Sequence, residues 1–76
     1  MKTNVEMAEI IFDEIIELYN YSKNPLTPNS GKLSLEKAWD LTKILAKCLN
    51  IQDAIIARYI IHNIGFATLL SDIKEA

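Results

Sequence analysis

The chain has 76 residues, of which 50% are hydrophobic and 24% charged, and its formal net charge is −2. This composition predicts one folded domain, 1–76, and it lacks the basic balance that most nucleic-acid-binding domains carry. The single cysteine excludes an intrachain disulfide, the first residues lack a secretory signal, and polar residues interrupt the most apolar window, so we expect a cytoplasmic protein without a membrane span.

The first predicted helix runs from about Asn4, its N-cap, to Tyr21. One face carries apolar residues at helical spacing: Val5, Ala8, Phe12, Ile15, Ile16 and Tyr19, widened by Met7, Ile11 and Leu18. The opposite face is acidic and contains four carboxylates: Glu6, Glu9, Asp13 and Glu17. A stripe of this kind is usually a solvated face; alternatively, it is a docking face for a basic protein partner. Ile10 lies within it, either as an exposed apolar residue or as a contact.

The segment from Lys23 to Leu33 is predicted to be the loop between the first two helices. Two prolines and a glycine within it prevent a continuous helix, and residues 28–31 are typical of a turn. We expect Leu26 and Leu33 to pack this loop onto the helices.

The second predicted helix begins at Ser34, a good N-cap, and ends at about Leu49. Its expected core face consists of Leu35, Ala38, Trp39, Leu41, Leu45, Ala46, Cys48 and Leu49. Residues 23–47 carry five lysines and two acids, a net charge of +3, whereas residues 1–22 carry five acids and one lysine, a net charge of −4. The first helix is therefore acidic and the second mildly basic.

A third helix is predicted over 51–64, with Asn50 as N-cap, Asp53 in its first turn and Gly65 as the residue that ends it. A short fourth helix, about 66–74, turns four apolar residues inward: Phe66, Leu69, Leu70 and Ile73. No segment alternates with the period of a strand. The expected fold is all-α, a small three- or four-helix bundle with a proline- and glycine-containing loop between helices one and two.

The third predicted helix is apolar on every side, which in so small a chain indicates a contact surface. Four of its positions can be assigned to the chain's own core: Ile56, Tyr59, Ile60 and Asn63. The positions that remain form a strip: Ala54, Ala57, Arg58 and Ile61. We predict that this strip contacts a protein partner, including a second copy of the chain about a two-fold axis. The alternative is that the fourth helix covers it within one chain.

Residues 42–61 carry a pattern of apolar and small residues around a tight turn. Leu45 and Ala46 form an apolar–small pair, 49–51 form the turn, and Ile56 and Tyr59 occupy later packing positions. This pattern resembles the helix-turn-helix of bacterial and phage regulators, with Asn50 in place of the usual glycine.

The resemblance implies DNA binding, with Lys43 and Lys47 on phosphates and Gln52 and Arg58 on bases. The positions that would then face the groove are Gln52, Asp53, Ala54, Ala57, Arg58 and Ile61. One cation among six positions is little for a DNA groove, so the sequence favours a protein contact over DNA.

No metal, cofactor, small-molecule substrate or catalytic role is expected. One histidine and one cysteine are too few for a zinc site, and the two glycines do not form a phosphate loop. His62 is expected at the C-terminal end of the third helix and Cys48 in the core; the alternative is a Cys48–His62 catalytic pair, for which the sequence positions no third group. The sequence thus predicts a small, non-enzymatic, regulatory interaction module that also associates with itself.

Overall fold

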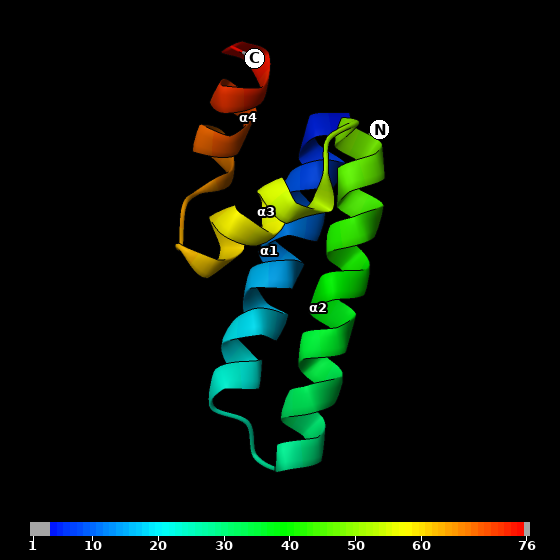
Figure 1. Cartoon of the computed structure of the whole chain (residues 1–76), viewed down its shortest axis with the longest axis vertical. Helices are drawn as coiled ribbons and strands as arrows, with labels where there is room; N and C mark the ends of the chain where they lie inside the picture. The colour runs from blue at the N-terminus through cyan, green and yellow to red at the C-terminus, as the bar shows by residue number, and fades with distance from the viewer. Residues whose placement is uncertain (1–3, 76) are drawn as a thin grey trace.

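The computed structural model describes residues 4–75 and contains four helices: α1 (Asn4–Lys23), α2 (Pro28–Leu49), α3 (Asp53–Ile61) and α4 (Phe66–Glu75). No strand occurs within this described range, so the predicted all-α class is confirmed. α1 and α2 run antiparallel as a hairpin, α3 crosses the hairpin, and α4 then runs toward the end of the molecule at which α1 begins (Figure 1). None of the helices within 4–75 has both the length and the apolar composition that crossing a bilayer requires.

All four helices contribute to one core. Its largest fully buried side chains are Phe12, Ile15, Leu45, Ile56 and Leu69. Phe66 is also buried, and its ring centroid lies 5.3 Å from that of Phe12, which ties α4 to α1. Tyr19 and Trp39 form a second aromatic pair, 5.7 Å apart, between α1 and α2. Helices too short to be stable alone are thereby held by burial of their apolar faces.

α2 begins at Pro28, so the predicted loop to Leu33 and start at Ser34 are wrong. Thr27 is the N-cap: its side chain accepts from the amide of Ser30, and the side chain of Ser30 accepts from the amide of Thr27. Proline suits the first helical position, where its missing N–H has no partner to lose. The predicted turn at 28–31 is therefore the first turn of α2.

Three residues near this end of the hairpin differ from expectation. Leu26 is 91% exposed and Leu33 57% exposed, so neither packs the loop onto the helices. Ser34 is buried inside α2, and its hydroxyl donates to the backbone oxygen of Leu18 across 2.7 Å. Gly31 allows the close approach of the loop, because a Cβ there would lie 2.6 Å from Cγ of Pro25.

The two later connections turn on asparagines. Asn50, expected as the N-cap of α3, is the left-handed C-cap of α2 with φ 58°. Gln52 is the N-cap of α3 and makes no side-chain capping bond. After His62, the C-cap of α3, Asn63 has φ 57°, whereas Gly65, the expected ending residue, has no positive φ. Asparagine is the residue after glycine that most readily takes this conformation.

Four positions expected on the core faces of the helices are exposed: Val5, Met7, Cys48 and Asn63. Val5 lies in the first turn of α1, Cys48 lies in the last turn of α2, and Asn63 is polar and belongs to a turn. The other positions assigned to the chain's own core in α3 are buried or half-buried: Ile56, Tyr59 and Ile60.

Candidate functional site

The predicted strip on α3 is largely bare. Ala54, Arg58 and Ile61 are exposed and Ala57 is half-buried, with Ile61 exposed to 49%. Ala54 and Ala57 line a shallow groove of about 340 Å³ together with Trp39, Thr42 and Lys43 of α2 and Asp53. Arg58 lines a different groove, and Ile61 lines neither. The strip therefore borders two hollows instead of forming one flat patch.

The groove that contains Arg58 is the larger of these two hollows, at about 530 Å³. It lies among the end of α2, α3 and α4, and its lining residues are Leu49, Asn50, Ile51, Ile55, Arg58, Tyr59, Leu69, Asp72 and Ile73. Most of these side chains are apolar, and the charged groups are Arg58 and Asp72. A lining of this kind, apolar with few polar groups, can receive an apolar side chain and hold an acidic group beside it through the arginine.

Tyr59 and Asp72 join α3 to α4 across this groove. The phenol of Tyr59 donates a hydrogen bond to the carboxylate of Asp72. This bond, with desolvation and the negative charge of Asp72 as further causes, raises the pKa of Tyr59 above its ordinary value. The positive charge of Arg58 acts in the opposite direction. At neutral pH the neutral phenol therefore keeps the two helices linked.

The four carboxylates of the acidic face, Glu6, Glu9, Asp13 and Glu17, are all exposed on α1. They form a charged surface on a different helix from the α3 strip. Their placement is compatible with a solvated face and equally with docking of a basic partner.

The four residues expected to contact DNA are exposed but do not share one hollow. Lys43 and Lys47 line a groove of about 340 Å³ with Ala46, Ile51 and Asp53, so a carboxylate sits beside the two cations. Gln52, at the N-cap of α3, lines neither this groove nor the one that contains Arg58. The positive charges expected to contact DNA therefore lie in separate grooves, and the carboxylate of Asp53 partly offsets those of Lys43 and Lys47.

Cys48 and His62 are not brought together in one hollow. Cys48 lines a groove of about 240 Å³ with Met7, Ala8 and Ile11, while His62 caps α3. Within residues 4–75, no group of three or more His, Cys, Asp or Glu side chains is arranged to hold a metal ion.

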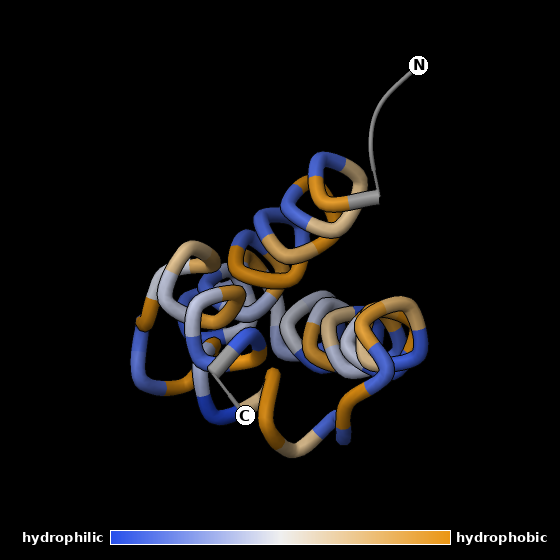
Figure 2. The backbone as a smooth tube through the Cα atoms, turned by 90° about the horizontal axis from the view of Figure 1, so that it is seen from above, coloured by the Kyte–Doolittle hydropathy of each residue, from blue (hydrophilic) through white to orange (hydrophobic). Residues whose placement is uncertain are grey.

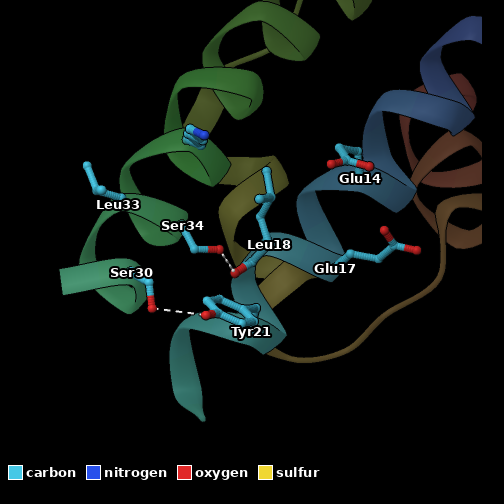
Figure 3. A pocket seen from close by; sticks show the side chains of 8 residues that line it. Glu14, Glu17, Leu18, Tyr21, Ser30, Leu33 and Ser34 are labelled. Carbon is cyan, nitrogen blue, oxygen red and sulfur yellow. Dashed lines mark hydrogen bonds between the residues drawn. The ribbon is translucent and has the colours of Figure 1, made fainter. Parts of the chain in front are cut away.

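A further groove, of about 350 Å³, lies at the loop end of the hairpin (Figure 3). The hydroxyls of Tyr21 and Ser30 are 2.9 Å apart, and the amide of Leu26 donates to the Tyr21 phenol. These bonds favour the phenolate and lower the pKa of Tyr21, the bond to Ser30 having the larger effect. Tyr21 thus joins Ser30 and the amide of Leu26, so these bonds close the loop end of the hairpin.

Comparison of the chain with protein-family models, with curated proteins and with solved structures found no match in any of the three. The site therefore has to be argued from its own residues. The sequence identified the exposed strip on α3 but missed the α3–α4 groove and the Tyr59–Asp72 bond. Tyrosine and aspartate thirteen residues apart give no local signal, because the intervening turn decides whether they meet.

Proposed function

We propose that this chain is a small, non-enzymatic helical module with a regulatory role, which binds a protein partner and associates with itself. The observation that carries the proposal is the bare strip of α3, where Ile61 stays 49% exposed although α4 follows it directly in the chain. Exposed apolar side chains that lie together on one helix face mark contact surfaces more often than apolar side chains that are scattered singly. The lone thiol is compatible with a cytoplasmic setting.

The proposed contact uses both apolar and charged groups. Ala54 and Ala57 are small enough for a partner helix to approach closely, and Ile61 supplies the apolar anchor. Arg58 lies on the rim of the α3–α4 groove, where it can pair with an acid of the partner. The acidic face of α1 is a second docking candidate for a basic segment.

The test is affinity capture with the chain as bait from the cells that produce it, followed by measured binding of each captured protein. Ile61→Glu is expected to weaken binding by ~tenfold or more, since it places a charge in the contact. Leu26→Glu is the control, because Leu26 is an apolar side chain that is 91% exposed and lies in the connection between α1 and α2, outside both proposed faces. Equal binding by both variants and the unchanged chain would contradict the proposal.

A second candidate function is DNA binding. It is supported by the left-handed Asn50 in the three-residue connection between α2 and α3, and by the exposure of Lys43 and Lys47. Phosphate contacts require that affinity for duplex DNA falls as salt is raised. Absence of such binding even at ~50 mM salt, where phosphate contacts are strong, excludes this candidate.

A further inference from the structure

Exposed apolar side chains gather on one face of the α1–α2 hairpin. Eight large hydrophobic side chains are exposed in residues 4–75, and five of them belong to this face: Met7, Ile10, Tyr21, Leu33 and Ile44. At ~100° per residue, the three on α1 lie within about 60° of one another, and so do Leu33, Ile44 and Cys48 on α2. We call this set, with Cys48, the outer hairpin face. Figure 2 shows how hydrophobic and hydrophilic residues alternate around each turn of the helices.

The outer hairpin face is turned away from the other two helices. α3 packs along Trp39, Thr42 and Lys43, which occupy another side of α2, and α4 is held on α1 through Phe12. The two grooves on the outer face are lined by residues of α1 and of 28–49 only: one contains Met7 and Cys48, and the other is the loop-end groove of Figure 3. No described segment of the chain covers this face.

Charge identifies what can cover it. α1 carries five acids and one lysine, a net charge of −4, and α2 carries four lysines and two acids, a net charge of +2. Glu14 and Lys37 lie at the same level, since both line the loop-end groove. If a second copy docks with its α1 on α2 of the first, an acidic helix meets a basic one. If instead α1 docks on α1, two acidic helices meet and repel.

We propose that the outer hairpin face is the interface between two copies of this chain. The two hairpins form a four-helix bundle about a two-fold axis parallel to the helices, with α1 of each copy on α2 of the other. Each hairpin face is ~30 Å long and ~20 Å wide, or ~600 Å², from 1.5 Å per residue and ~10 Å per helix. This is near the ~800 Å² per partner of a standard interface.

The interface rests on the self-association in our proposed function, but it places the second copy on the hairpin and leaves α3 free. Each copy in the dimer then offers its α3 strip and its α3–α4 groove to another protein. One chain thus uses two faces for two different partners.

The oligomeric state tests the interface. Sedimentation at micromolar concentration is expected to give the mass of two chains for the unchanged protein and the mass of one chain for Ile44→Glu. Leu33→Glu, at a second exposed position of the same face, is expected to act alike, and circular dichroism checks that both variants stay helical. Ile61→Glu is the matched control and should remain dimeric while losing the captured partner. A monomeric unchanged chain, or a dimer that tolerates Ile44→Glu and Leu33→Glu, overturns the proposal.

Mild oxidation tests the arrangement. In the proposed dimer, Cys48 of one copy faces residue 7 of the other copy. The two Cys48 residues lie diagonally across the four-helix bundle, so their Cα atoms are farther apart than the ~7 Å that a disulfide can span. An equal mixture of the unchanged chain with a Met7→Cys, Cys48→Ala chain is expected to give a cross-linked mixed dimer. Either protein alone should give none. A dimer that cross-links only within the separate proteins, or not at all, overturns the arrangement of α1 on α2.

Discussion

The α1–α2 hairpin and the α3–α4 pair are held in different ways. The hairpin helices have 20 and 22 residues, and the connection between them is fixed by a capping box and by the Gly31–Pro25 approach. α3 and α4 have 9 and 10 residues, and α3 begins without a side-chain cap. Helices shorter than ~12 residues are marginal by themselves, so the second pair depends on core contacts. The hairpin is held by its closed loop as well as by the shared core, whereas the C-terminal pair is held by its contacts with that core.

Removing the side chain that anchors α4 to α1 should have the largest effect on stability. Phe66→Ala deletes a buried ring that packs on Phe12, and we expect a loss of ~3–5 kcal/mol in the free energy of unfolding. Urea denaturation followed by circular dichroism measures it. Leu26→Ala, at a position that is 91% exposed and outside both proposed faces, is the control and should change stability by less than ~0.5 kcal/mol. A small loss for Phe66→Ala would show that α4 is not anchored through the core.

Gly31→Ala tests how tightly the hairpin is closed. The new Cβ would lie 2.6 Å from Cγ of Pro25, so we expect a loss of ~1–3 kcal/mol from overpacking. Gly65→Ala is the matched control, because nothing lies within 4 Å of its Cβ position and its φ is not positive. That change should stay within ~0.5 kcal/mol, since lower unfolded-state entropy and a poorer N-cap offset each other. Equal losses at both glycines would contradict this account of the closure.

Thr27→Ala removes the capping side chain at the start of α2. The amide of Ser30 then loses its acceptor, and we expect a loss of ~1 kcal/mol. Gln52→Ala provides the comparison at α3, where the side chain makes no capping bond, and should cost less. The two variants are compared by thermal unfolding, and a larger cost at Gln52 would reverse the contrast between the two regions.

The two regions should also differ in how their tyrosines titrate. Tyr21 in the hairpin has a lowered pKa and Tyr59 in the C-terminal pair a raised one, so Tyr21 should ionise first as pH rises through 10.0, the ordinary value. Ultraviolet absorbance of the phenolates measures the order in which the tyrosines ionise. The variants Tyr21→Phe and Tyr59→Phe assign each step to its residue. Ionisation of Tyr59 at or before that of Tyr21 would contradict the bond to Asp72.

The two shifts have opposite consequences for stability. The raised pKa of Tyr59 gives a contribution that is present below its unfolded-state pKa and is lost as pH rises through its folded-state pKa. The lowered pKa of Tyr21 gives a contribution that is present above its unfolded-state pKa and is lost as pH falls through its folded-state pKa. Alkaline pH should therefore loosen α4 from α3 while it strengthens the loop end of the hairpin.

Periodicity was sufficient to predict the helices, because Ala8, Phe12 and Ile15 on α1 and Phe66 and Leu69 on α4 recur at the spacing of one helix face and are buried. Local signals were ambiguous at the connections. Asparagine serves both as N-cap and as left-handed C-cap, so the sequence did not decide the role of Asn50.

The start of α2 and the extent of the candidate site were harder to predict. Pro28 breaks a helix interior but suits a first turn, and the reciprocal cap comes from Ser30 instead of the usual glutamate or glutamine. The α3 strip could be identified from its apolar pattern. Its division between two grooves could not, because that division depends on where the turn at 62–65 directs α4.

The only tryptophan of the chain stands between the two proposed binding faces. Trp39 packs against the ring of Tyr19, and Trp39 also lines the groove that contains Ala54 and Ala57. The indole is half-buried, so its fluorescence responds when water leaves that groove. A partner seated on Ala54 and Ala57 should move the emission to shorter wavelength, whereas a second copy on the outer hairpin face should leave it unchanged. The protein therefore carries its own optical reporter, which separates the two kinds of association without any label.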